Sequence, residues 1–500
     1  MQENTNKAIA VNSLILYIRL AIVAICGLFY TRFSLQALGI NDFGLFSVIA
    51  SIISFASIIN TIMIVTSNRF IAMAIGKNDY QGANAAFNVN LVTHIGIAFL
   101  TIILALPIGH WYIANHISYS GDLNTVRYVF DISILATAVS FIGVPYNGLL
   151  LARERFFVFC STDVLASIFK LVSTYILIDH FEQKLLIYAV ITAIMTAYPT
   201  FVFFVYCRSE FKDITRFKWI SDKTKYAETF RFSLAIGYGA IATIAKIQGG
   251  AIIINMFFST AMNAGLAVAN SVNSMLQLFA NNAQKSISPQ IVKSYASRNI
   301  NRSVYLVCLA SRITYLSMFF VSIPFLYVPG LIFSIWLEDI PPYAISFTHF
   351  LIIDSLILCI NAGITDFVNA TGKIKAYQLI INTIITMSVI IGYYSIRNGM
   401  NPENLFYIYI LFSVIVFFVR PFILVRISQF DIRRLIKESY IPVGLITVFM
   451  MLPFALTSIF GPWELLAFSY LYFIGICFFL GLTVHERNAI LSKCKAHFSK

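Results

Sequence analysis

Apolar segments near the length of a membrane-spanning helix recur along the whole chain, separated by short polar intervals. A transmembrane helix needs about 20 mostly apolar residues. The pattern therefore predicts an all-α polytopic membrane protein with about 14 transmembrane helices. The predicted spans are 11–31, 43–65, 89–109, 129–151, 164–181, 185–207, 232–258, 260–284, 304–328, 343–369, 377–396, 405–425, 440–460 and 465–484.

The stretch from Phe232 to Gln284 differs from the other apolar segments because it is interrupted by polar side chains. It reads as two helices, the first with Lys246 in its middle. The second carries amides at gaps of 3, 4, 4 and 3 residues, which places them on one helical face. Two interpretations stay open: the wall of a polar cavity, or hydrogen bonding between packed helices. The amides are Asn270, Asn273, Gln277, Asn281 and Gln284.

Lysine and arginine are distributed unequally between alternate loops, which predicts the orientation of the chain. Twenty-six of the 35 lie on one side of the predicted membrane, four on the other and five within spans. The rule that positive loops are cytoplasmic places both termini in the cytoplasm. The net charge of +13 then reflects topology and attraction to anionic lipid, with no nucleic-acid partner expected. No cleavable signal is expected, because Arg19 interrupts the first apolar run.

Composition supports the membrane assignment and excludes several classes of site. The chain is 59% hydrophobic and 11% charged, against about 25% charged in soluble domains. The seven cysteines contain no C-x-x-C pair, and the seven histidines form no zinc-binding pattern. We therefore expect neither a disulfide framework nor a metal site.

The longest hydrophilic interval, 208–231, follows the sixth span and is expected to be a basic cytoplasmic linker. It divides the chain into an N-lobe of six spans (1–207) and a C-lobe of six spans (232–426). A weak repeat with an offset of 221 residues supports two lobes of the same orientation. The remaining residues, 427–500, hold two extra spans and a cytoplasmic tail.

Charged residues inside spans are the candidate functional residues, because a charge at the bilayer centre costs about 2.5–3.5 kcal/mol. Arg19, Lys246 and Arg312 are the candidate substrate-binding cations. Lys170 and Arg420 are placed where their side chains can extend to the membrane surface. Asp354 and Asp366, both in the tenth span, are interpreted either as counter-ions, Asp354 to Arg312 or Lys246, or as sites of proton or sodium coupling.

Several short motifs resemble bacterial polysaccharide flippases of the multidrug/oligosaccharidyl-lipid/polysaccharide (MOP) transporter superfamily. The most specific is Leu-Gly-x-x-Asp-Phe-Gly, residues 38–44, at the start of the second span. The resemblance implies two six-helix bundles in a V shape, with a cavity lined by spans one, two, seven and eight. It also implies a bacterial inner membrane, and no catalytic residue or cofactor. The matching segments are 14–19, 31–32, 38–46, 67–70, 76–79, 144–147 and 152–156.

The resemblance implies that an undecaprenyl-pyrophosphate-linked oligosaccharide for O-antigen, capsule or exopolysaccharide synthesis crosses the membrane by alternating access. Polysaccharide polymerase machinery would then be a partner. Arginine and lysine suit the pyrophosphate, and amides suit sugar hydroxyls. An ion-coupled drug or small-molecule exporter of the same superfamily is the alternative, although it would favour acidic over basic cavity residues. A membrane polymerase or glycosyltransferase is a third interpretation, disfavoured by the short outer loops.

Overall fold

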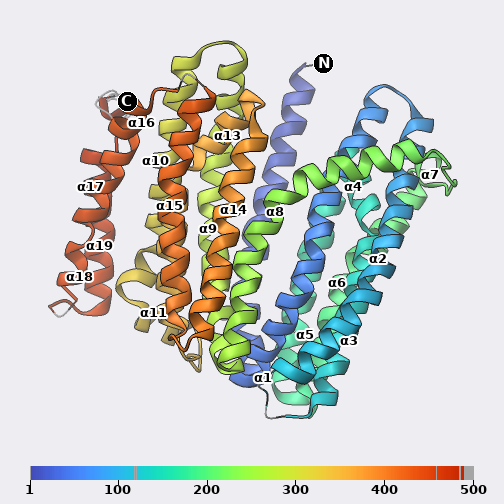
Figure 1. Ribbon diagram of the computed structural model, residues 1–500, viewed down its shortest axis with the longest axis horizontal. Helices are drawn as coiled ribbons and strands as arrows, with labels where there is room; N and C mark the ends of the chain where they lie inside the picture. Colours follow the sequence, from blue (N-terminus) through green and yellow to red (C-terminus); the bar gives the residue numbers. More distant parts are fainter. Residues whose placement is uncertain are drawn as a thin grey trace. The chain divides into compact units, whose positions relative to one another are not determined.

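The computed structural model describes residues 2–117, 119, 121–428, 430–457, 459–482 and 486–488, and all regular secondary structure in them is helical (Figure 1). The chain divides into two compact units, unit 1 (Met1–Ala267) and unit 2 (Val268–Lys500). This division falls within a helix, later than the predicted linker at 208–231. The lobe boundaries drawn from the sequence stay a prediction.

Unit 1 is a bundle of long helices in which α1 packs against both α5 and α8, and α3 packs against α2 and α6 (Figure 1). Its core includes Ile71, Phe87, Tyr146 and Leu149, all buried. The helices are α1 (Gln2–Gly76), α2 (Tyr80–His116), α3 (Leu123–Ile142), α4 (Val144–Ala152), α5 (Phe156–His180), α6 (Lys184–Glu210), α7 (Lys212–Thr215), α8 (Lys223–Phe257) and the beginning of α9 (Thr260–Ala296).

Helix α1 contains both of the first two predicted spans, joined at Gly39. This residue has φ 72° and ψ 173°, a conformation outside the helical region that glycine adopts without a steric penalty. The Leu-Gly-x-x-Asp-Phe-Gly motif thus begins at the kink in α1. Asp42, within the motif, accepts a hydrogen bond of 2.7 Å from the hydroxyl of Tyr119.

Gly44, the last residue of that motif, allows α1 to approach the start of α9 closely. A Cβ added there would lie 1.8 Å from the carbonyl oxygen of Thr260 and 3.0 Å from the backbone nitrogen of Ala264. Backbone atoms cannot move aside as a flexible side chain can. The glycine is therefore a packing requirement of unit 1.

We expect Gly44→Ala to lower stability by about 1–3 kcal/mol, the usual cost of overpacking. Thermal unfolding of the purified protein in detergent would measure the loss. Gly96→Ala is the matched control, since a Cβ at Gly96 on α2 meets nothing within 4 Å. Equal unfolding temperatures for the two variants would contradict this account of Gly44.

The segment after α6 is bound to α2 by side-chain hydrogen bonds. The Asn84 side chain donates to the carbonyls of Ile214 and Arg216, at 2.8 and 2.7 Å. Asn88 donates to the Arg216 carbonyl at 3.0 Å. Asp222 then caps α8, and hydrogen bonds from Thr224 lower the pKa of the Asp222 carboxyl, which keeps the cap charged.

Unit 2 is organised around α10, whose buried face packs with α13, and around the pair α14–α15 (Figure 1). Ile360 and Asn361 separate α12 from α13, and the two helices are bent by 41° relative to each other. After the remainder of α9, the elements are α10 (Ile300–Tyr327), α11 (Pro329–Trp336), α12 (Ala344–Cys359), α13 (Ala362–Thr371), α14 (Ile374–Arg397), α15 (Glu403–Ile427), α16 (Ile432–Leu435), η1 (Ile436–Tyr440), α17 (Ile441–Phe449), α18 (Leu452–Ala455), α19 (Pro462–Ile476) and η2 (Cys477–Gly481).

Ten helices among the described residues are long and apolar enough to cross a membrane, or eleven if the bent pair α12–α13 counts as one span. The sequence predicted fourteen, and the two numbers differ in two places. The first two predicted spans both fall in α1, where the stretch Ile18–Ser54 is counted once and part of the second predicted span lies outside the residues searched. The described apolar part of α8 is Ile244–Phe257, which leaves much of the seventh predicted span outside that search, and the eighth falls in α9, which carries the amides.

Candidate functional site

In unit 1, Arg19 is held between α1 and α5 by a carboxylate and an aromatic ring. Its Nε donates to Oδ2 of Asp163 at 2.8 Å, and its Nη2 contacts the same oxygen. The Phe159 ring centroid lies 4.8 Å from the guanidinium carbon. The Arg19 and Asp163 side chains are 25% and 35% exposed. The predicted fifth span begins at residue 164, but α5 begins at Phe156, so Asp163 lies within the helix.

Lys170 lies on the same helix, fourteen residues after its first residue, Phe156. That distance is about 21 Å along the axis. Its ammonium nitrogen is 4.1 Å from the centroid of the Tyr30 ring on α1, a cation–π contact. The side chain is thus directed at α1, whereas the sequence suggested that it could reach the membrane surface. The Tyr30 hydroxyl in turn donates to that of Tyr188.

Lys246 lies on α8, in the same unit as Arg19, and is half-buried. It precedes Phe257, the last residue of α8, by eleven positions, which is about 16 Å along the helix. Helix α8 packs against α1. Two of the three predicted cations are therefore on helices of unit 1 that pack together.

In unit 2, three of the five amides on α9 form hydrogen bonds with the bent pair α12–α13. Gln277 donates to the hydroxyl of Ser355 at 3.0 Å, and that hydroxyl donates to Asn273 at 2.9 Å. Gln284 donates to the Ala362 carbonyl at 2.9 Å and to Oδ2 of Asp366 at 3.1 Å. Helix–helix hydrogen bonding, one of the two open interpretations, thus accounts for these three.

The other two amides differ in exposure: Asn270 is half-buried and Asn281 is exposed. Contact between any of the five amides and a substrate stays a prediction. Asn281 has the surroundings most suited to such a contact, because an exposed amide retains its capacity to bind sugar hydroxyls.

Asp354 on α12 is 8% exposed and accepts a hydrogen bond of 2.5 Å from Ser413 on α15. The break between α12 and α13 follows it, where Asn361 donates to the Phe417 carbonyl at 3.0 Å and accepts from Tyr440. A buried carboxyl beside a broken membrane helix has surroundings suited to ion coupling. The choice between counter-ion and coupling site for Asp354 stays open, and the same holds for Asp366.

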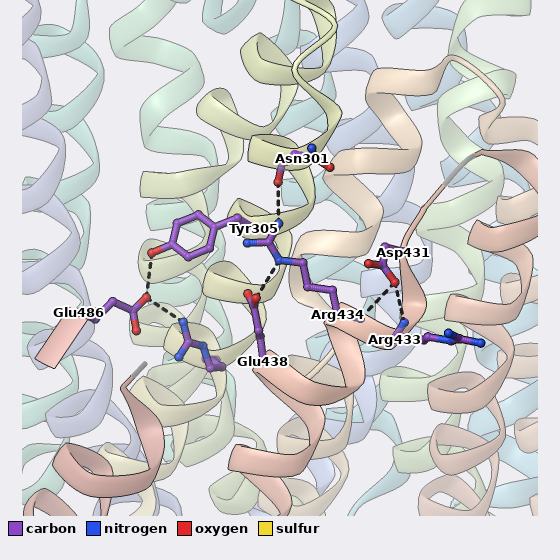
Figure 2. Close-up of polar contacts among 8 residues, drawn as sticks. Asn301, Tyr305, Asp431, Arg433, Arg434, Glu438 and Glu486 are labelled. Atoms are coloured by element: carbon purple, nitrogen blue, oxygen red, sulfur yellow. Dashed lines mark hydrogen bonds and ion pairs between the residues drawn. The ribbon is translucent and has the colours of Figure 1, made fainter. Parts of the chain in front are cut away.

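Arg312 on α10 is 2% exposed and is bound by the chain's C-terminal region. Its Nη2 donates to Oε1 of Glu486 at 2.8 Å, and its Nη1 donates to the Gly481 carbonyl at 3.0 Å. Tyr305 donates to the same oxygen of Glu486 at 2.9 Å (Figure 2). The sequence had offered Asp354 as a partner for Arg312, whereas the structure pairs Arg312 with Glu486. This geometry favours a structural role for Arg312 over substrate contact.

A second polar group lies nearby, where α16 and η1 meet α10 (Figure 2). Arg434 forms an ion pair with Glu438 at 2.8 Å, donates to the Asn301 carbonyl at 3.2 Å and lies over the Tyr305 ring. Together these contacts fasten the last helices of unit 2 to α10.

Within the described ranges, no cluster of three or more His, Cys, Asp or Glu side chains could hold a metal ion.

Comparison with solved structures identifies the fold. An inward-facing multidrug resistance MATE family transporter of the MOP superfamily aligns with a TM-score of 0.65 and 14% identity, over 83% of this chain and 99% of its own. The lipid II flippase MurJ, in an inward closed conformation, aligns with a TM-score of 0.67 and 12% identity, over 96% of this chain and 100% of its own. The MATE multidrug transporter DinF-BH aligns with a TM-score of 0.63 and 13% identity, over 84% of this chain and 95% of its own.

These likenesses define an all-helical polytopic membrane protein with the fold of MOP-superfamily transporters. No known protein family matches the sequence of the chain, and no curated protein sequence does. The resemblance noted from the sequence motifs is therefore confirmed at the level of superfamily fold, while the polysaccharide flippase subfamily stays a proposal.

Proposed function

We propose that this protein is a flippase for undecaprenyl-pyrophosphate-linked oligosaccharide repeat units. It moves them from the cytoplasmic to the outer leaflet of the bacterial inner membrane by alternating access. The observation that carries the proposal is the set of cations within the apolar parts of α1, α5 and α8. Segments 11–31, 156–180 and 232–257 contain Arg19, Lys170 and Lys246 against two acids, Asp163 and Asp179, and Asp179 is the next-to-last residue of α5. Such a set attracts an anionic head group and repels a cationic drug.

The extent of the structural likeness supports the same proposal. The alignment with the lipid II flippase covers 96% of this chain, whereas those with the two MATE transporters cover 83% and 84%. That protein is a flippase for lipid II. A glycan carried on a lipid pyrophosphate is the corresponding substrate class here, because arginine and lysine bind phosphate oxygens while the lipid tail remains in the bilayer.

An ion-coupled exporter of drugs or other small molecules is the second candidate function. The observation that favours it is the buried carboxyl of Asp354 beside the break between α12 and α13. A proton or a sodium ion bound there would couple transport to an ion gradient. The same coupling is compatible with a flippase, so the substrate distinguishes the two candidates.

Deleting the gene in its own bacterium tests the proposal. We expect loss of surface polysaccharide, with single lipid-linked repeat units accumulating where externally added periodate cannot oxidise them. A plasmid copy of the gene should reverse both effects. Loss of a polymerase would instead leave single units accessible to periodate from outside. Loss of a drug exporter would leave the polysaccharide unchanged and make the cells more sensitive to drugs, which would contradict the proposal.

Both termini are proposed to lie in the cytoplasm, and reporter fusions test this orientation. A fusion after Asp222, which precedes α8, should report a cytoplasmic position because the surrounding interval is strongly basic. A fusion after Ser120, which lies outside the described residues, should report the opposite side. Paired alkaline phosphatase and green fluorescent protein fusions would give the readout. The reverse result at either site would overturn the orientation.

A further inference from the structure

The contact between α1 and α5 contains a line of charged and aromatic side chains. We infer that Arg19, Lys170 and Asp163 form a diphosphate-binding subsite, with Asp163 as the resident counter-ion that the substrate displaces. The inference rests on the proposed function and deepens it, because it assigns the recognition of two phosphates, rather than one, to a particular place in unit 1.

The spacing of these residues places them along one helix contact. Asp163 and Lys170 are seven residues apart on α5, and Arg19 and Tyr30 are eleven apart on α1. Those intervals correspond to about two and three helical turns, so each pair shares a face. Arg19 meets Asp163 and Tyr30 meets Lys170. The two cations are therefore about 10 Å apart along α5, an interval that long side chains can close around one diphosphate.

The degree of exposure shows that this line of residues is not closed off inside the helix bundle. Arg19 and Asp163 retain 25% and 35% of their side-chain exposure, and Lys170 is half-buried. Ionised side chains at this depth are unfavourable against lipid tails. An ion pair that served only to hold helices together would be expected to be closed off, as that of Arg312 with Glu486 is at 2% and 16% exposure.

A phosphate group can replace the present partner of Arg19, and it can bind Lys170 beside its present partner. The guanidinium of Arg19 directs two N–H groups at one carboxylate oxygen, and phosphate oxygens accept the same pair of bonds. The Tyr30 ring attracts the Lys170 ammonium through its face and supplies no oxygen acceptor there. The ammonium has three N–H donors with which to bind phosphate oxygens.

The charges favour two phosphates over one. With Asp163 ionised, the three side chains carry a net charge of +1, and displacement of the carboxylate from Arg19 presents two cations to the ligand. A diphosphate diester carries two negative charges and a phosphate diester one. The second cation, Lys170, is thus the residue that distinguishes the two head groups.

The test compares two lipids that differ by one phosphate. Purified full-length protein is titrated in detergent micelles with undecaprenyl-diphospho-N-acetylglucosamine and with undecaprenyl-phospho-N-acetylglucosamine, and native mass spectrometry gives both dissociation constants. We expect the wild type to prefer the diphosphate by at least about tenfold, since one charged hydrogen bond is enough for such a ratio. Lys170→Met should bring the ratio close to one, and Lys170→Arg should retain it.

Asp163→Asn should tighten the binding of both lipids by several fold, because it removes the competing carboxylate. Two matched controls should leave both constants unchanged. Asp131→Asn alters another half-buried acid of unit 1, the partner of His110 on α2, and Lys223→Met removes an exposed cation at the start of α8. Gel filtration and thermal unfolding establish that each variant is folded, and Lys170→Gln replaces Lys170→Met if the latter is not.

The possible failures are separable. A wild type that binds neither lipid, or prefers the monophosphate, contradicts the proposed function itself. A wild type that prefers the diphosphate together with a folded Lys170→Met that keeps the preference overturns the inference alone. Weaker binding by Asp163→Asn would make Asp163 a support that positions Arg19 and would overturn its role as a displaceable counter-ion.

Discussion

Replacing Lys246 with alanine should reduce flipping of a lipid-linked glycan at least about tenfold while leaving folded protein in the membrane. The residue lies on α8, well inside the helix and half-buried. A cation at that depth is tolerated where it meets water or an anion. A hydrogen bond to a charged group contributes about 1.5–3 kcal/mol, which corresponds to a tenfold effect or more. Membrane abundance and surface polysaccharide, measured together, give the result.

Substitutions that retain the positive charge distinguish electrostatic attraction of the head group from a requirement for side-chain shape. Lys246→Arg should retain more activity than Lys246→Ala, because a mobile head group depends on charge more than on geometry. Arg19→Lys should lose more, because arginine offers two parallel donors to phosphate and lysine does not. Lys225→Ala, at an exposed position of α8, is the control that should behave as the wild type.

A structural role for Lys246 makes the opposite prediction. If its task were to neutralise an acid such as Asp354, Lys246→Ala would reduce the amount of protein rather than the activity per molecule. Removing both charges together would then restore the protein level. Comparing Lys246→Ala, Asp354→Ala and the double variant distinguishes the two roles, and full activity of Lys246→Ala would exclude substrate attraction altogether.

Arg312→Ala should be the most destabilising of the charge substitutions, by about 3–5 kcal/mol, the usual cost of breaking a buried ion pair. The substitution leaves Glu486 beside Tyr305 without the guanidinium and leaves the Gly481 carbonyl without its donor. The last helices of unit 2 should then detach more readily from α10. Thermal unfolding in detergent and limited proteolysis of the C-terminal region measure the two effects.

The double variant Arg312→Met with Glu486→Gln should recover part of that loss, because neither charge is then left unpaired. Arg19→Ala is the informative comparison, since its ion pair is more exposed and solvent screens it. Arg19→Ala should lower the stability less than Arg312→Ala does, and it should lower the rate of transport more. If Arg312→Ala were as stable as the wild type but inactive, Arg312 would be a substrate contact, as the sequence alone suggested.

The membrane fold was predictable because its signal is local. Each span requires a run of apolar residues, and loop charge sets orientation, so hydropathy and the placement of lysine and arginine carry most of the information. Helix α9 is continuous in the structure, but its amides make it less apolar than the helices that match a membrane span by length and composition.

The partners of the charged residues were not predictable in the same way, because they depend on contacts between distant segments. Arg312 and Glu486 are separated by 174 positions, and Arg19 and Asp163 by 144. Glu486 follows the last predicted span (465–484), and Asp163 precedes the predicted fifth span (164–181). The helical periodicity of the α9 amides was visible from the sequence, whereas their contacts with α12 and α13 required the fold.

Flipping in reconstituted vesicles tests the central claim most directly. Purified protein is placed in liposomes that contain a fluorescent undecaprenyl-diphospho-linked oligosaccharide in both leaflets, and an added membrane-impermeant quencher reports the fraction that becomes exposed. The account predicts near-complete quenching with the wild type, either without an ion gradient or, where transport is ion-coupled, with one applied. It predicts that about half of the fluorescence, that of the outer leaflet, is quenched with Arg19→Ala or Lys246→Ala. Quenching by wild-type vesicles that never exceeds that of protein-free vesicles under any gradient, alongside transport of a cationic dye, would contradict it.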